Sequence, residues 1–328
     1  MDGKRKMTKQ FEGSASIDYN KSGDDFFDNE EYDKALAEYN KAVELNPKDA
    51  LAYKNRGVVF GRMGETDKQI VEYTKAIELN DKFSEAYRYL GKVFLEKQQY
   101  DKALSYLTKA NQLEPDSSNA HHHRGAVYFN QQEYDEAIAD FTKAIQLEPD
   151  DGISYYNRGA IYFLQKEYDK AIADFTKTIK LGDNQAEAYS KRGTSYANKG
   201  QFDKAIADFT KAIELNPNHS ESYENRSKIY EFTGKQEEAQ KDRHRIKRIN
   251  EGKLDTEPKN IEELTKELNT LIGLDKVKKE VSQLINFLKV QQMREAKGMA
   301  VQPLSRHLVF YGNPGTGKTT VARTLSQI

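Results

Sequence analysis

The sequence predicts a mainly α-helical fold, a solenoid of stacked helical hairpins, followed by an incomplete α/β segment at the carboxyl end. Two observations carry this prediction. A spacing of 34 residues recurs through most of the chain, and one apolar run near residue 310 leads into a glycine-rich loop. The composition agrees, because 37% hydrophobic and 31% charged residues among 328 indicate a fold with much surface per residue.

Composition also excludes several classes of function. With 51 Lys and Arg against 52 Asp and Glu, the net charge of -1 provides no global field for recruiting nucleic acid or an acidic membrane. The absence of cysteine excludes disulfides, thiolate nucleophiles and cysteine-ligated metals. The sequence contains no run of about 18 apolar residues, the length needed to span a bilayer. The first residues lack the apolar stretch of a secretory signal. We therefore expect a cytoplasmic protein with no membrane partner and no specific nucleic-acid partner.

The repeat has six copies, each with the same order of elements. Each copy ends in a turn, at Pro47, Asp81, Pro115, Pro149, Asp183 and Pro217. Early in each copy a glycine precedes an aromatic residue by three positions, in the pairs Gly23 and Phe26, Gly57 and Phe60, Gly91 and Phe94, Gly125 and Tyr128, Gly159 and Tyr162, and Gly193 and Tyr196. Later a residue that is Ala in five copies precedes a large one by four positions, in the pairs Ala35 and Tyr39, Gln69 and Tyr73, Ala103 and Leu107, Ala137 and Phe141, Ala171 and Phe175, and Ala205 and Phe209.

These spacings predict two helices in each copy. Apolar residues three and four apart make one face of a helix, and a small residue lets the partner helix approach closely. One hairpin cannot bury that face alone, whereas stacked hairpins share it with their neighbours. We expect a right-handed superhelix with a concave groove.

The order aromatic, Gly, aromatic, Ala, aromatic, Ala and Pro resembles the tetratricopeptide repeat (TPR). The resemblance covers 16–219 as six repeats. Residues 220–250 resemble a degenerate seventh repeat, with Ser227 at the glycine position, whose second helix would cap the stack. Residues 1–15 would form an N-terminal tail.

The resemblance implies a scaffold whose groove, lined by the first helix of each repeat, binds a partner protein or peptide. The residues expected to face the groove are Lys54, Arg88, Lys92, His122, Phe129, Tyr156, Phe163 and Leu164. Cations and aromatic rings together suit an extended acidic or apolar segment. One TPR subtype clamps a carboxylate terminus with Lys, Asn and Arg, but this set is not assembled here. Asn20 and Asp24 occupy the first-repeat positions of that clamp, and Glu85 and Tyr89 replace its third-repeat cations.

Two series of basic residues could indicate other sites. The tract His121, His122 and His123 could suggest a metal, but neighbours on a helix point about 100° apart, so we expect packing roles instead. Arg56, Arg124, Arg158, Arg192 and Arg226 recur in phase and could form a phosphate-binding stripe. We expect their stems to pack between helices and their guanidinium groups to pair with acids of neighbouring turns.

The repeat pattern disappears after residue 250. Residues 251–260 are expected to form a linker, and 261–328 a separate module with one helix ending at Gly273 and another at Gly298. A strand, a loop and a helix follow. The loop fits GxxxxGK[ST], the Walker A pattern, with Gly312, Asn313, Pro314, Gly315, Thr316, Gly317, Lys318 and Thr319. Its backbone N–H groups would surround phosphates, Lys318 would reach the β and γ phosphates, and Thr319 would bind Mg²⁺.

The flanks of this loop, LIGLDKVKKEV and SRHLVFYGNPGTGKTTVA, resemble the start of an AAA+ ATPase module of the CbbX and stage V sporulation protein K type. The resemblance implies ATP as the nucleotide, Ile272 and Gly273 beside the adenine, and a homo-oligomeric ring in the complete protein. Only nine residues follow Thr319, so we expect a module truncated after Walker A, without its acidic Walker B strand, sensors and arginine finger. Hydrolysis needs those groups. No catalytic residue is assigned, ATP binding by this piece stays open, and the chain alone would be a non-catalytic monomer.

Two functions are therefore in competition. In one, the repeats are a scaffold attached to an ATP-binding module that, when complete, hydrolyses ATP to remodel the bound partner. In the other, the chain is a pure TPR binding module with a vestigial, non-catalytic P-loop segment.

Overall fold

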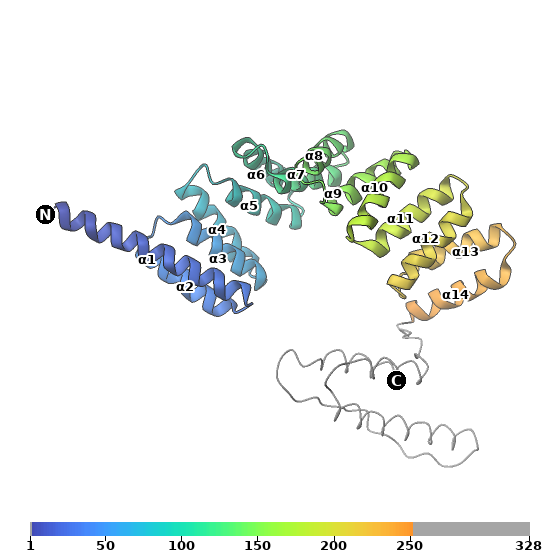
Figure 1. Ribbon diagram of the computed structural model, residues 1–328, viewed down its shortest axis with the longest axis horizontal. Helices are drawn as coiled ribbons and strands as arrows, with labels where there is room; N and C mark the ends of the chain where they lie inside the picture. Colours follow the sequence, from blue (N-terminus) through green and yellow to red (C-terminus); the bar gives the residue numbers. More distant parts are fainter. Residues whose placement is uncertain (1, 252–328) are drawn as a thin grey trace, which may run out of the picture. The chain divides into compact units, whose positions relative to one another are not determined.

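The computed structural model describes the backbone of residues 2–251 and the side chains from residue 15 onward. This part consists of α-helices joined by short turns, without a strand (Figure 1). The helices are α1 (Asp2–Asp28), α2 (Tyr32–Leu45), α3 (Ala50–Arg62), α4 (Thr66–Leu79), α5 (Ser84–Glu96), α6 (Tyr100–Leu113), α7 (Ser118–Asn130), α8 (Tyr134–Leu147), α9 (Gly152–Leu164), α10 (Tyr168–Leu181), α11 (Gln185–Asn198), α12 (Phe202–Leu215), α13 (Ser220–Phe232) and α14 (Gln236–Asn250). The linker and AAA+ segment expected over 251–328 lie outside the described residues, except for Glu251.

The chain divides into two compact units, Met1–Ala212 and Ile213–Ile328. In the first unit, α1 packs against α2, α3 against α4, α5 against α6, α7 against α8, and α9 against α10, so each repeat is a hairpin. In the second unit, α13 and α14 form the hairpin of the seventh repeat. Helix α1 begins at Asp2, so the backbone of the segment expected as a tail is helical and continuous with the first repeat.

The turn inside every hairpin has one residue in the left-handed backbone region. These residues are Glu30, Gly64, Gln98, Gln132, Lys166, Gly200 and Gly234. The next N–H donates back to a carbonyl five residues earlier, as from Glu65 to Phe60 at 2.8 Å and from Gln99 to Phe94 at 2.8 Å. A left-handed residue with this hydrogen bond is the Schellman ending of a helix. The same device therefore ends the first helix of each repeat.

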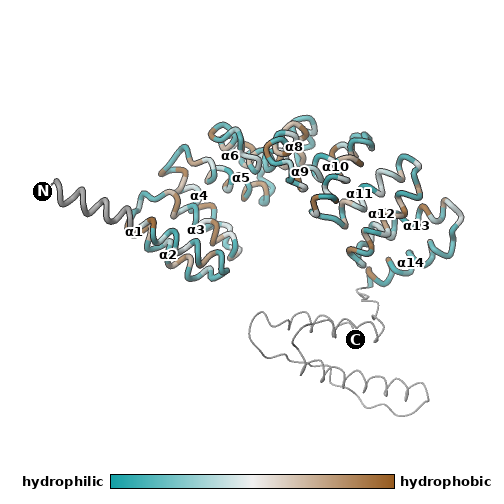
Figure 2. The backbone as a smooth tube through the Cα atoms, in the orientation of Figure 1, coloured by the Kyte–Doolittle hydropathy of each residue, from teal (hydrophilic) through white to brown (hydrophobic). Residues whose placement is uncertain are grey.

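The core is built from the paired positions that the repeat predicted. Phe141, Phe175 and Phe209 are fully buried, as are the alanines four residues before them. Brown, hydrophobic stretches alternate with teal ones along the helices (Figure 2). The expected small and large pairing is confirmed, since a Cβ added to Gly57 would lie 2.5 Å from the ring of Tyr73.

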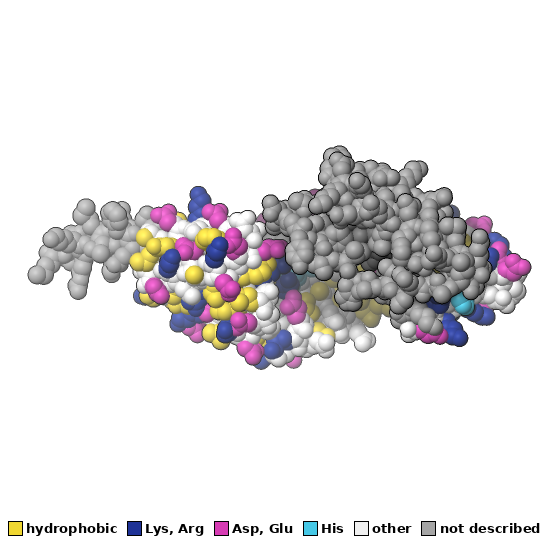
Figure 3. Space-filling model, turned by 90° about the horizontal axis from the view of Figure 1, so that it is seen from below, with side chains coloured by type: hydrophobic (Ala, Val, Ile, Leu, Met, Phe, Trp, Pro, Cys, Tyr) yellow, Lys and Arg dark blue, Asp and Glu magenta, His cyan; other side chains and the backbone are white. Residues whose placement is uncertain are grey.

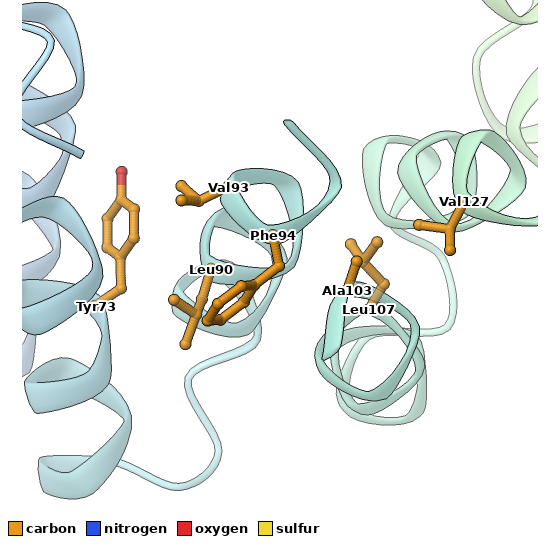
Figure 4. Close-up of a cluster of buried hydrophobic side chains, with 7 residues drawn as sticks. All are labelled: Tyr73, Leu90, Val93, Phe94, Ala103, Leu107 and Val127. Atoms are coloured by element: carbon orange, nitrogen blue, oxygen red, sulfur yellow. The ribbon is translucent and has the colours of Figure 1, made fainter. Parts of the chain in front are cut away.

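Neighbouring hairpins of the first unit share core side chains. One cluster joins side chains from α4, α5, α6 and α7, drawn in Figure 4. Its members are Tyr73, Leu90, Val93, Phe94, Ala103, Leu107 and Val127. Residues from three successive repeats thus cover one another, as expected for stacked hairpins.

Gln69, the one exception at the alanine position, is accommodated by a second exception. Residue 61 is a glycine, and a Cβ added there would lie 2.4 Å from Gln69 Nε2. The longer side chain therefore occupies the space that Gly61 leaves in the facing helix.

Candidate functional site on the first helices

The recurring arginines form internal ion pairs, which confirms their expected packing role. In the fourth repeat, Arg124 donates from Nε and Nη2 to the two oxygens of Asp140, at 2.7 and 2.8 Å. The five pairs, which we call rungs, are Arg56 with Glu72, Arg124 with Asp140, Arg158 with Asp174, Arg192 with Asp208, and Arg226 with Asp242. Each acid follows its arginine by 16 residues. In the fourth repeat, the hydrogen bond to Asp140 raises the pKa of Arg124.

A third bond from the same guanidinium group reaches the preceding repeat. Arg158 Nη1 donates to Thr142 Oγ1 at 2.9 Å, and Arg192 Nη1 donates to Thr176 Oγ1 at 3.0 Å. In these two repeats the arginine thus ties the first helix to its own second helix and to the second helix of the preceding repeat. These guanidinium groups are committed to internal bonds.

The three consecutive histidines diverge to different partners. His121 Nδ1 lies 2.9 Å from Asp140 Oδ1, and His122 Nδ1 lies 2.7 Å from Ser154 Oγ. Burial, with the nearby positive charges of Arg88 and Lys92 and the ring of His122, lowers the pKa of His123 to about 3. Within the described residues, no His, Asp and Glu side chains are grouped to hold a metal ion.

His122, one of the residues expected to face the groove, also helps to cap the next first helix. Asp151 precedes α9 and accepts from the N–H of Ser154 at 3.0 Å, while His122 Nδ1 lies 3.6 Å from the Asp151 carboxylate. Burial alone would raise the pKa of Asp151, but hydrogen bonds from His122 and Ser154 lower it to about 2. The structure therefore places His122 half-buried in a link between repeats.

The same link occurs in the first repeat and was not foreseen. Asp49 caps α3 by accepting from the N–H of Leu51 at 3.1 Å, and its other oxygen accepts from Ser16 at 2.7 Å and Asn20 at 2.8 Å. An Asp directly before a predicted helix is the signal that would have identified this N-cap.

The aromatic residues expected in the groove are partly covered. Phe129 packs against Tyr134 and Phe163 against Tyr168, with ring centroids 6.3 and 5.8 Å apart, so both rings lie at the turn of their own hairpin. Tyr156 lies 5.7 Å from the buried Phe175 ring. Leu164, at the end of α9, is 51% exposed.

Two of the three cations expected in the groove lie at one carboxylate, and the third lies one helical turn away. Lys54 Nζ from α3 lies 3.5 Å from Glu85 Oε2, and Arg88 Nη2 lies 3.9 Å from Glu85 Oε1. Lys92 stands one turn after Arg88 on α5, 3.6 Å from Glu96. We call Lys54, Arg88 and Lys92 the cation cluster.

The first helices of successive repeats are neighbours, since α1 contacts α3, α5 contacts α7, and α9 contacts both α7 and α11. We call the side of these helices that carries the cation cluster and Leu164 the first-helix face. On the view in Figure 3, the described side chains mix hydrophobic, basic and acidic types. None of the described helices has an apolar stretch long enough to cross a bilayer.

The nucleotide-site residues expected from the sequence, Ile272, Gly273 and the loop Gly312–Thr319, lie outside the described residues.

In the part of the chain that the structure describes, seven helical hairpins, each with the same left-handed turn between its two helices, define a helical-repeat protein. Profiles described as TPR repeat match residues 23–64 and 91–132. Profiles described as tetratricopeptide repeat match 72–105, 118–151, 153–184, 186–219 and 209–241. The chain therefore belongs to the tetratricopeptide-repeat family, and its described part is a protein-interaction scaffold.

Solved structures share this fold. PilF of Pseudomonas aeruginosa superposes with a TM-score of 0.62 at 20% identity, over 66% of this chain and 99% of that one. YrrB, whose structure is described as a TPR protein with an unusual peptide-binding site, gives 0.50 at 24% identity, over 57% and 96%.

Curated relatives match over a shorter stretch. Stage V sporulation protein K of Bacillus subtilis is 37% identical over 68 residues, which are 21% of each chain. The ESX-3 secretion system protein EccA3 of Mycobacterium tuberculosis is 45% identical over 62 residues, which are 19% of this chain and 10% of EccA3. The chain thus matches about a fifth of the first relative and a tenth of the second.

Proposed function

We propose that this chain joins a scaffold for a partner protein to the nucleotide-binding start of an AAA+ ATPase module, and that the complete module hydrolyses ATP to remodel the partner held by the repeats. The observation that carries the proposal is the presence, in one chain, of the repeat array and of the sequence Gly312–Thr319. The likeness to stage V sporulation protein K and EccA3 supports it.

For the nucleotide, the proposal rests on residue chemistry. Backbone N–H groups of a glycine-rich loop bind phosphate oxygens, and a lysine at the position of Lys318 adds a positive charge. The hydroxyl of Thr319 suits Mg²⁺, a hard cation that prefers oxygen ligands. Bound Mg²⁺ and ATP would supply a polarised phosphoryl group, and Ile272 and Gly273 would lie beside the adenine.

Equilibrium titration of the 328-residue chain with fluorescently labelled ATP tests this half of the proposal. We expect binding that requires Mg²⁺ and is lost in Lys318→Ala. A matched control is Lys75→Ala, which removes an exposed cation of α4. Equal binding by both variants, or no binding by the unsubstituted chain, would contradict nucleotide binding by Gly312–Thr319.

The scaffold half is tested by charge reversal on the first-helix face. Replacing Lys54, Arg88 and Lys92 together with Glu should abolish capture of acidic partners and leave the helical circular dichroism intact. An unchanged set of captured proteins would show that partners bind elsewhere.

The second candidate is a pure binding module, which the repeat array of the described residues supports by itself. It predicts partner capture that ATP does not alter. Release of captured partner on addition of ATP to the complete module would exclude it.

A further inference from the structure

The cation cluster differs from the rungs in how loosely its carboxylate is held. The rung of Arg124 and Asp140 has contacts of 2.7 and 2.8 Å. Glu85 lies 3.5 Å from Lys54 and 3.9 Å from Arg88, beyond the roughly 2.7–2.9 Å of a charge-assisted hydrogen bond. Two cations thus share one carboxylate, and neither contact is a short hydrogen bond.

The two cations and the carboxylate also differ in solvent exposure. The side chains of Lys54 and Arg88 are each only 14% exposed, whereas that of Glu85 is 46% exposed. The cations are held in place by their surroundings, while the carboxylate lies towards solvent. A partner's carboxylate could therefore replace Glu85 without moving either cation.

Arg88 is also preoriented. Its guanidinium carbon lies 4.3 Å from the centroid of the Tyr89 ring, a cation–π contact that restrains the position of the group. An arginine fixed in this way loses less side-chain entropy when it binds a carboxylate.

No charge on the adjacent helix compensates the cluster. His123 of α7 lies close enough to Arg88 and Lys92 for their charges to lower its pKa, so it is neutral at pH 7. Among the ion-paired side chains of α3 and α5, the three positive charges of Lys54, Arg88 and Lys92 exceed the two negative charges of Glu85 and Glu96 by one. The charge of Asp151 also reaches His123, but this carboxylate accepts from Ser154 and contacts His122. Leu51, three residues before Lys54 on α3 and therefore on the same side of that helix, is 43% exposed.

From these contacts we infer that Glu85 is an internal stand-in for a partner carboxylate, and that the first-helix face binds an extended segment in which an acidic residue flanked by apolar residues displaces Glu85 from Lys54 and Arg88. The inference deepens the proposed scaffold function and rests on it. It predicts that the acidic residue of the partner binds between α3 and α5 and that an apolar neighbour in the partner contacts Leu51.

The probes are two capped peptides, one in which glutamates alternate with leucines and one with glutamines in place of the glutamates. Binding to the 328-residue chain is measured by fluorescence anisotropy. We expect the glutamate peptide to bind about tenfold more tightly than the glutamine peptide, the ratio given by one partly covered ion pair.

The variants separate the groups involved. Because Glu85→Gln removes the competing carboxylate, it should strengthen binding of the glutamate peptide by about three- to tenfold, and Arg88→Gln should weaken it by about tenfold. The matched controls are Glu78→Gln and Lys75→Gln, which alter an exposed pair of α4 with the same charges and should change nothing.

An affinity for the glutamate peptide that is unchanged or lower in Glu85→Gln would overturn the stand-in role. Equal binding of both peptides would also overturn the inference, yet it would leave the scaffold function intact, since a peptide is still bound. Failure of the charge-reversal capture experiment is a separate result and bears on the scaffold function itself.

Discussion

The third and fifth repeats solve the same packing problem with different chemistry. In the fifth repeat, Arg158 and Asp174 form a rung with two hydrogen bonds of 2.8 and 2.9 Å. At the same two positions the third repeat has Leu90, which is 1% exposed, and Tyr106, which stacks on Phe94 with ring centroids 5.5 Å apart. An apolar pair thus replaces an ion pair without changing the helices.

This difference indicates what the rungs contribute. A partly buried ion pair gains little over a well-packed apolar pair, because the attraction between the charges is offset by the cost of removing them from water. Removing one partner is different, since the remaining charge is left buried. The third repeat shows that packing alone can hold the hairpin, whereas a repeat with a rung needs both of its charged partners.

The largest expected effect is loss of one rung acid. Asp174→Ala should lower the free energy of unfolding by about 3 kcal/mol, because Arg158 would remain partly buried without its carboxylate. Urea unfolding followed by circular dichroism measures it. The control is Asp169→Ala, which removes an exposed acid of the same helix, and should cost less than about 1 kcal/mol.

A double variant tests the comparison directly. Arg158→Leu with Asp174→Tyr copies the third repeat into the fifth and should recover most of the loss. A double variant as unstable as Asp174→Ala would show that the third repeat depends on other neighbours.

A second exception in the third repeat should cost stability. Asn111 of α6 is 6% exposed, and neither its side-chain oxygen nor its nitrogen has a hydrogen-bond partner. The equivalent residues of the next two repeats are Ile145 and Ile179. Asn111→Ile should raise the free energy of unfolding by about 2 kcal/mol, because an unpaired amide is replaced by an apolar group. The same urea titration measures it, and a destabilised variant would indicate that Asn111 has a partner after all.

The junction of the third and fourth repeats should be sensitive to acid. The pKa of His123 is about 3 in the folded protein and 6.5 for the unperturbed side chain, so the unfolded chain binds the extra proton between these values. The stability that depends on neutral His123 is therefore fully present above pH 6.5. It decreases as the pH falls towards 3, by at most about 1.4 kcal/mol per pH unit.

Urea unfolding at pH 7, 6 and 5 should show this slope, and His123→Gln should reduce it. A slope equal in both proteins would assign the acid sensitivity to other groups.

The smallest effect concerns the hairpin turns. Gln98 has a φ of 56°, in the left-handed region, whereas the second repeat has Gly64, with a φ of 77°, at the equivalent position. Gln98→Gly should stabilise by about 0.5–1 kcal/mol, because glycine adopts this conformation without a steric penalty. The converse change, Gly64→Ala, should destabilise by a similar amount in thermal unfolding, and opposite signs would contradict the turn comparison.

The sequence alone predicted the hairpins, the paired core positions and the internal role of the arginines. It did so because a 34-residue period and the spacings of three and four within it report which residues share a helix face. It also located the seventh repeat, but not Asp242, which pairs with Arg226 within that hairpin.

Tertiary structure decided which groups meet across repeats. Asp49 and Asp151 each cap the first helix of one repeat while contacting the first helix of the preceding repeat. Glu85 lies between Lys54 of the second repeat and Arg88 of the third. Periodicity places a residue on a face of its own helix. Whether a side chain from the next repeat lies 3 or 6 Å away depends on how the helices pack and which rotamers they allow, and no spacing in the sequence records that.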